Sequence, residues 1–117
     1  MIVFRKEAKS KIAEELARGA DARLAGLEGR ARVCARRAAG AATREYLELR
    51  GIATPGSSAY DLLVFLQDLP EVSPEIRQAA GHLLTRVDES FSLPVEADLL
   101  AEAGWLAQAL EASLDAG

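Results

Sequence analysis

The sequence has 117 residues and a formal net charge of −4; half of its residues are apolar and only 5% are aromatic. This length supports one domain, 1–117, with a single hydrophobic core. No apolar run reaches the roughly 18 residues of a membrane span, so no membrane partner is expected. One histidine and one cysteine rule out an internal disulfide and disfavour a metal site, and no cofactor is expected.

The N-terminal residues, MIVFRKEAKSKIAEE, carry charge and lack the apolar core of a signal peptide. A lone cysteine is also typical of proteins that function in a reducing compartment. We therefore expect a cytoplasmic protein.

The sequence pattern predicts helices throughout. Leu and Ala dominate and β-branched residues are sparse, which favours helix over strand. Apolar residues with the helical period form five segments, which cover 4–25, 28–50, 58–69, 73–87 and 94–114. Breaks rich in Gly, Pro and Ser separate the later segments. The expected fold class is all-α, a compact bundle of four to five helices.

Capping residues mark where the last three helices begin. Ser58 opens the third helix as the first residue of a capping box, and Ser73 is the N-cap of the fourth. The last helix is expected to begin near Pro94. Its acidic residues Glu96 and Asp98 then suit the positive end of the helix dipole.

The segment 28–50 is apolar on two sides. One ridge holds Ala31, Ala35, Ala38, Ala42 and Leu49, and a nearly opposite ridge holds Val33, Gly40 and Leu47. A helix with two apolar ridges is packed from two sides, so this segment is expected to be the central helix. Cys34, which lies in it, is expected to be a small buried hydrophobe and not a nucleophile.

Charge is divided unequally along the chain. Residues 1–50 hold 12 of the 14 basic and 7 of the 18 acidic residues, whereas residues 51–117 hold 2 basic and 11 acidic residues. Such a division is typical of proteins with an anion-binding face. The alternative is that the two halves pack on each other and pair their charges.

Three arginines, Arg30, Arg37 and Arg44, follow one line of the central helix at intervals of seven residues. They predict a stripe that binds the phosphates of RNA or a nucleotide. The alternative is a solvated face paired with Glu45, Glu48 and the acidic half of the chain. No aromatic rings stand between the arginines, which weakens a platform for stacked bases.

The single histidine, His82, follows Arg77 by five residues in the fourth helix. Five steps of about 100° place the two side chains about 140° apart around the axis. They do not face each other within one helix, so a catalytic site that used both would need a second copy of the helix. Arg86 lies one turn after His82 on the same side and is a further phosphate-binding candidate.

Trp105 is the one tryptophan of the chain. It lies about 80° from the core line of the last helix, on a strip rich in alanine. An exposed Trp in such a position is typical of an interface anchor, so we expect a homodimer.

The order of these features resembles the HEPN superfamily of small, usually dimeric helical bundles, over roughly residues 10–112. The resemblance rests on the long helix GRARVCARRAAGAATREYLELRG and on the short helix SAYDLLVFLQDL that follows a loop. Many RNA-cleaving members carry an Arg, a polar residue, three variable residues and a His, and this chain has Arg77, Gln78 and His82 in that pattern. Gln78 departs from the usual Asn, Asp or His, and no Tyr follows His82 closely.

The resemblance implies a composite, metal-independent site where two helices meet at a dimer interface. Arg77 would hold the scissile phosphate, and His82 would transfer a proton during attack by the 2′-hydroxyl. The resemblance also implies a protein that binds nucleotide or RNA and that belongs to a toxin–antitoxin pair with a nucleotidyltransferase partner.

Two other interpretations stay open. One is a non-catalytic oligomerisation or interaction module without a ligand. The other is a binder of a small ligand, with a cleft edged by Tyr60 and Trp105. Cleavage requires that Arg77 and His82 come together at a shared surface, which separates it from the first alternative.

Overall fold

The computed structural model describes residues 1–85 and 98–115, and within them the chain forms five helices and no strand. The helices are α1 (Lys6–Leu24), α2 (Glu28–Leu49), α3 (Ala59–Gln67), α4 (Pro74–Leu84) and α5 (Leu99–Ser113). The predicted all-α fold is confirmed. No helix in the described part is long and apolar enough to cross a membrane.

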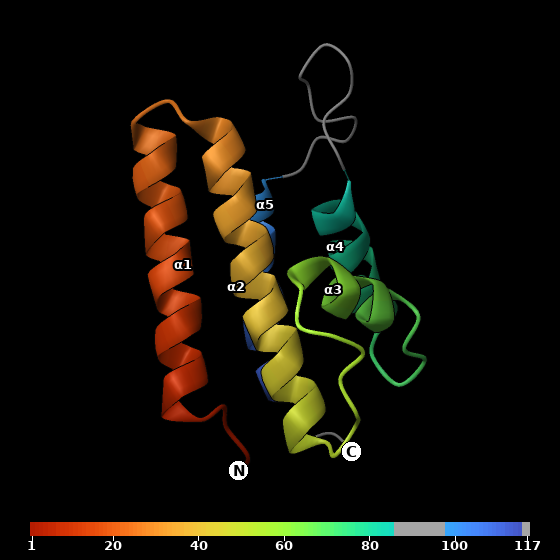
Figure 1. Ribbon diagram of the computed structural model, residues 1–117. Helices are drawn as coiled ribbons and strands as arrows, with labels where there is room; N and C mark the ends of the chain where they lie inside the picture. The colour runs from red at the N-terminus through yellow and green to blue at the C-terminus, as the bar shows by residue number, and fades with distance from the viewer. Residues whose placement is uncertain (86–97, 116–117) are drawn as a thin grey trace.

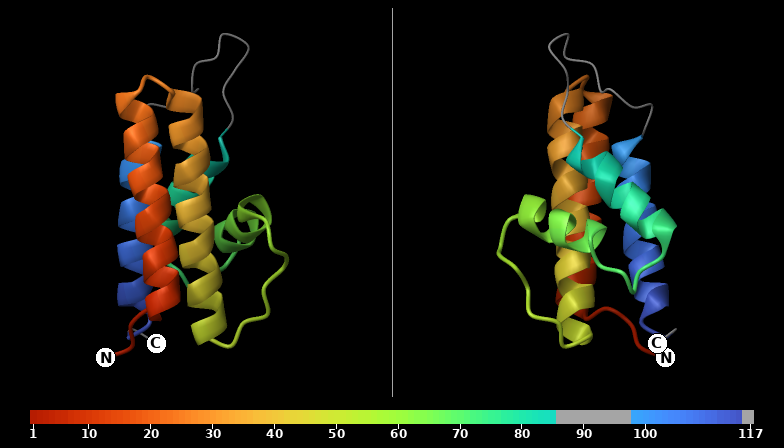
Figure 2. Two further views of the ribbon diagram at one scale, coloured as in Figure 1. Left: turned by 60° about the vertical axis from the view of Figure 1, so that its left-hand side comes forward. Right: turned by 90° about the vertical axis from the view of Figure 1, so that its right-hand side faces the viewer.

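The central helix is α2, which contacts each of the other four. α1 and α2 form an antiparallel hairpin, and α5 packs against both of them from one side (Figure 1). α3 and α4 contact each other and lie beside α2, away from α1 (Figure 2). The side of the hairpin opposite α5 has none of the described helices over it (Figure 1).

The alanine ridge of α2 is buried, as predicted. Ala31, Ala35, Ala38 and Ala42 have no exposed surface. Because alanine is small, the backbones of the neighbouring helices approach α2 closely, which agrees with its place at the centre of the bundle.

On the opposite ridge of α2, Gly40 and Leu47 are buried but Val33 is exposed. A Cβ atom at Gly40 would lie 2.8 Å from the Cβ of Ala59, the first residue of α3. Only glycine therefore lets α3 cross α2 at this point. Packing from two sides is confirmed at Gly40 and Leu47 but is wrong at Val33, because α3 crosses two turns away from it.

The predicted caps of α3 and α4 are present. The hydroxyl of Ser58 accepts a hydrogen bond from the backbone N–H of Asp61 at 3.0 Å, and that of Ser73 accepts one from Ile76 at 3.2 Å. Each bond satisfies a donor that a helix leaves free in its first turn. Both helices begin at the residue after the serine.

α4 ends at Leu84, three residues earlier than the sequence pattern predicts. Thr85 has extended backbone, with ψ of 129°. The guanidinium of Arg36 donates to the carbonyl oxygens of Leu83 and Thr85, at 2.7 and 2.9 Å. A side chain of α2 thus satisfies two backbone carbonyl groups at the C-terminal end of α4.

α5 begins at Leu99, and Asp98 is its N-cap, whereas the expected start near Pro94 would have placed Asp98 inside the helix. The Asp98 carboxylate accepts from the backbone N–H of Ala101 at 3.2 Å. The expected start near Pro94 and the acidic residue Glu96 lie outside the described residues.

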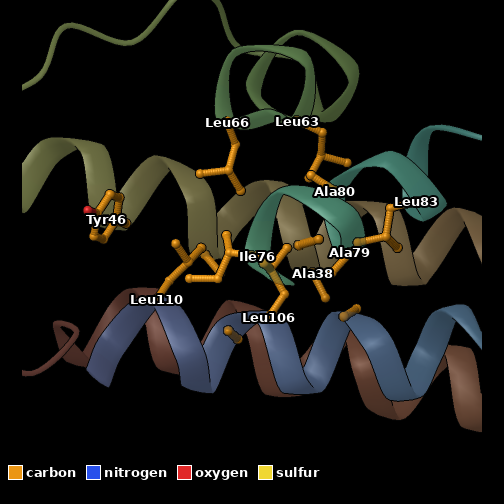
Figure 3. Packing of buried hydrophobic residues seen from close by; sticks show 14 of the residues in the cluster. Ala38, Tyr46, Leu63, Leu66, Ile76, Ala79, Ala80, Leu83, Leu106 and Leu110 are labelled. Carbon is orange, nitrogen blue, oxygen red and sulfur yellow. The ribbon is translucent and has the colours of Figure 1, made fainter. Parts of the chain in front are cut away.

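The core lies where α3, α4 and α5 meet α2 (Figure 3). Its buried side chains are mainly Leu and Ala, and they include Ala38, Tyr46, Leu63, Leu66, Ile76, Ala80, Leu83, Leu106 and Leu110. Cys34 is also buried, as predicted. Because α4 contacts both α3 and α5, opposite sides of α4 face different helices.

Candidate functional site

Within the described residues, one of the three arginines in the α2 stripe is hydrogen-bonded to another part of the chain. Arg30 and Arg37 are exposed, and neither pairs with a carboxylate in the part of the chain that the structure describes. Arg44 is partly buried and donates to the carbonyl oxygens of Gly56 and Ser57, at 3.4 and 3.2 Å. Two of the three predicted arginines are therefore available to a ligand, and the third also holds the loop after α2.

The structure adds two cations of α1 to this stripe, Lys11 and Arg18, which the sequence analysis missed. Two neighbouring clefts of about 410 and 640 Å³ lie along the seam between α1 and α2, and both are lined by Arg37. Lys11 and Arg44 line the first, and Arg18 and Arg30 line the second. We call these five residues the basic seam. Lys11 and Arg18 are seven residues apart, and this repeat of the α2 spacing was the available signal.

A buried carboxylate lies between the two cations of α1. Glu15 has no exposed surface; its Oε1 accepts from Nη1 of Arg18 at 3.0 Å and lies 3.9 Å from Nζ of Lys11. Its Oε2 is buried without a hydrogen-bond partner among the described residues. Glu15 thus holds Lys11 and Arg18 in place and offsets part of their charge, whereas Arg30 and Arg37 keep theirs.

The ion pairs that join the two halves of the chain in the described part do not include the exposed arginines of the stripe. The pairs between halves in the described part are Lys9–Glu111 at 3.5 Å, Arg23–Asp98 at 2.9 Å and Arg50–Glu71 at 2.9 Å. Glu45 and Glu48, which the alternative interpretation paired with the stripe, both pair with Arg5, at 2.7 Å each. Pairing between halves therefore explains part of the charge division but does not neutralise Arg30 and Arg37.

The structure separates the two predicted catalytic residues within one protomer. His82 faces α5, where its Nδ1 lies 2.7 and 2.9 Å from the two carboxylate oxygens of Glu102. Arg77 lies on the side that faces α3, since Gly81, one turn further along that side, faces Gln67. The Nε of Arg77 is buried and has no hydrogen-bond partner in the described part. One chain by itself does not bring Arg77 and His82 together.

Among the described residues, the exposed aromatic side chains are Tyr60 and Trp105, and they edge different clefts. Trp105 is 46% exposed and borders a cleft of about 460 Å³ between α4 and α5, which is also lined by the carboxylates of Glu75, Asp98 and Glu102. Tyr60 borders a cleft formed by α2, α3 and the end of α4. The described residues therefore form no cleft edged by both rings, which the small-ligand interpretation requires, because α3 and α5 lie on different sides of α4.

The chemistry of the site is carried by its cations. No group of three or more His, Cys, Asp or Glu that could hold a metal occurs among residues 1–85 and 98–115. The further phosphate-binding candidate, Arg86, lies outside these ranges.

Comparisons with protein-family models, with curated proteins and with solved structures found no match for this chain.

Proposed function

We propose that this protein is a HEPN-like helical homodimer that binds RNA or a nucleotide through phosphate groups held at the basic seam. The observation that carries the proposal is that Arg30 and Arg37 are exposed without a carboxylate partner in the described part of the chain. Guanidinium groups bind phosphate oxygens through paired N–H donors. Clustered cations also gain affinity because binding releases counterions from the nucleic acid.

The spacing of the cations favours a ligand with more than one phosphate. Arg30 and Arg37 are seven residues apart, which is about 10 Å along α2. Lys11 and Arg18 repeat this spacing across the seam. A strand of RNA or the polyphosphate chain of a nucleotide can place a separate phosphate group against each of these cations.

Binding of a labelled single-stranded RNA, followed by fluorescence anisotropy over a range of salt concentrations, tests the proposal. We expect wild-type affinity to fall steeply with salt, and the double variant Arg30→Gln/Arg37→Gln to bind at least about tenfold more weakly, with a salt slope smaller by about 2. The matched control is Lys9→Gln/Arg50→Gln, which removes two cations that pair with carboxylates away from the seam. It should bind nearly as the wild type does.

Two results would overturn the proposal. In the first, the wild type binds neither RNA nor a nucleoside triphosphate in a salt-dependent way. In the second, the two double variants lose RNA affinity equally. Adding Arg44→Gln to the seam variant should abolish binding. Because Arg44 also holds the carbonyl groups of the loop after α2, thermal melting must show that this triple variant stays folded.

RNA cleavage is a further step beyond binding. Since one protomer separates Arg77 from His82, a cleavage site requires α4 helices of two protomers to meet, as the resemblance to the HEPN superfamily implies. A nucleotidyltransferase partner in a toxin–antitoxin arrangement is likewise proposed on that resemblance. The single cysteine supports the cytoplasm as the place where the protein acts.

A further inference from the structure

One end of the basic seam is apolar. Near the turn between α1 and α2, the floor of the cleft of about 640 Å³ is formed by Ala22, Ala25, Leu27, Val33 and Cys34. Leu27 is 46% exposed, Val33 is 42% exposed and Leu24, at the same turn, is 88% exposed. Large aliphatic side chains gathered in this way on a surface mark a site of interaction. We call this cleft the apolar groove.

The rim of the apolar groove is cationic. Arg18, Arg30 and Arg37 line it, and Asp21 is the one carboxylate among its described lining residues. Arg18 pairs with glutamates of its own helix, whereas Arg30 and Arg37 have no such partner in the described part. An occupant must therefore offer apolar groups to the floor and negative charge to the rim.

The shape of the groove fits a helix. It lies between two antiparallel helices on the open side of the hairpin, while α5 fills the other side, where Gly19 faces Leu100 (Figure 1). Side chains of two adjacent helices leave a groove into which the ridges of a third helix pack. An amphipathic helix recognised in this way contributes apolar anchors at helical spacing.

Two other occupants fit the groove less well. A second copy placed by a two-fold axis with the same surface facing itself would bring Arg30 and Arg37 against their own equivalents, which is a repulsive arrangement. Single-stranded nucleic acid gains much of its affinity from bases stacked on aromatic rings. No aromatic side chain is among the described residues that line this groove.

We infer that the apolar groove docks an acidic amphipathic helix of a protein partner. Its apolar face lies on Leu27 and Val33, and its carboxylates pair with Arg30 and Arg37. This interaction does not depend on RNA binding, because the apolar floor is not part of the phosphate site. Since both ligands use Arg30 and Arg37, the partner helix competes with RNA.

The full-length protein can be tested with a synthetic helical peptide about 18 residues long, roughly five turns, with Leu on one face and Glu on the other. One comparison peptide has the same composition with the leucines spread around the helix, and another has Lys in place of Glu. Binding is measured by isothermal titration calorimetry. The Leu/Glu amphipathic peptide should bind at least about tenfold more tightly than either comparison peptide.

The decisive variant is Leu27→Ser/Val33→Ser, which removes the apolar floor without changing charge. Both side chains are exposed, so the fold should be kept. The matched control is Ile2→Ser/Val3→Ser, which replaces two exposed aliphatic residues at the other end of the hairpin (Figure 1). We expect the first variant to lose peptide affinity by about tenfold or more and the control to keep it, while both bind RNA as the wild type does.

The inference is overturned if the amphipathic peptide does not bind the wild type, or if both double variants bind it equally. It is also overturned if the Leu27→Ser/Val33→Ser exchange dissociates a dimer in light scattering, since the occupant is then a second copy. Loss of RNA affinity in that variant would assign the groove to RNA, and loss of binding to phosphatidylserine vesicles would assign it to a membrane. Failure of RNA binding in the wild type leaves the peptide result intact, so the two proposals fail separately.

Discussion

His82 of α4 and Glu102 of α5 are joined through one imidazole nitrogen, with Nδ1 at 2.7 Å from Oε1 and 2.9 Å from Oε2. A carboxylate at Nδ1 favours a proton on that nitrogen and leaves Nε2 as the acceptor. A histidine that acts as a general base is oriented by a carboxylate in the same way. The pair therefore suits either of two roles, a link between two helices or an oriented base.

Substitution of Arg77 and His82 tests the composite site. If it exists, the wild type cleaves single-stranded RNA in the presence of EDTA, and Arg77→Ala and His82→Ala each remove the activity. Mixing the two single variants should restore part of it only if each site takes the two residues from different chains. Electrophoresis of the RNA products is the measurement, with circular dichroism to show that the variants are folded.

Absence of cleavage by the wild type would contradict the composite site and leave His82 with a structural role. In that case His82→Ala should lower the free energy of unfolding by about 1 kcal/mol, because a half-buried hydrogen bond to a carboxylate is lost. Gln78, which departs from the usual nuclease pattern, would then be the first residue to exchange.

Arg5 and Glu45 should make part of the stability depend on pH. Hydrogen bonds from the Arg5 side chain lower the pKa of Glu45 below its usual 4.5, against the opposing effect of burial. Because the pKa is lowered in the folded state, this stabilisation is complete above pH 4.5 and is lost as the pH falls through the folded-state value. Urea unfolding at neutral and acidic pH should show that acidification lowers the free energy of unfolding less for Glu45→Gln than for the wild type.

The matched control for this pH effect is Glu48→Gln. Glu48 also pairs with Arg5 but is much more exposed, so its pair contributes little to stability. Substitution of Glu48 should leave the decrease in unfolding free energy at acidic pH nearly as large as in the wild type. An equal decrease in the wild type and in both variants would reject this role for Glu45.

Two glycines of α2 should respond to the same substitution with opposite signs. Gly40→Ala should lower the free energy of unfolding by about 1–3 kcal/mol, because the added Cβ would lie 2.9 Å from the Cα of Ala59 and would force α3 away. Gly29→Ala should raise it by up to about 1 kcal/mol, since the added Cβ would meet no atom within 4 Å beyond its chain neighbours and the nearby backbone of α2, and alanine is the better helix former. Urea unfolding of both variants is the measurement, and stabilisation by Gly40→Ala would contradict the close crossing of α2 and α3.

Trp105 should anchor a homodimer. Light scattering at micromolar concentration should give about twice the chain mass for the wild type and a shift towards the monomer for Trp105→Ala, because truncation of a central aromatic anchor typically costs more than about 2 kcal/mol. Tyr60→Ala, which truncates an exposed ring on a different cleft, is the control. A monomeric wild type, or a dimer that Trp105→Ala leaves unchanged, would reject the prediction.

The helices were predictable because their signals are local. Ser58 and Ser73 start α3 and α4 through hydrogen bonds to residues only three positions further along the chain. The alanine ridge of α2 repeats with the helical period. The early end of α4 was not predictable in this way. It depends on Arg36, a residue 47 positions before the Leu83 carbonyl that it binds.

The candidate site was visible in the sequence only as a set of residue types. Spacing along α2 identified Arg30 and Arg37, and spacing along α4 placed Arg77 and His82 on different sides of that helix. That Glu45 and Glu48 turn to Arg5, and that α1 lays Lys11 and Arg18 along the same seam, was decided by how the helices pack. The helical period determines which residues share one side of a helix. Which other helix packs against that side depends on contacts between segments far apart in the chain.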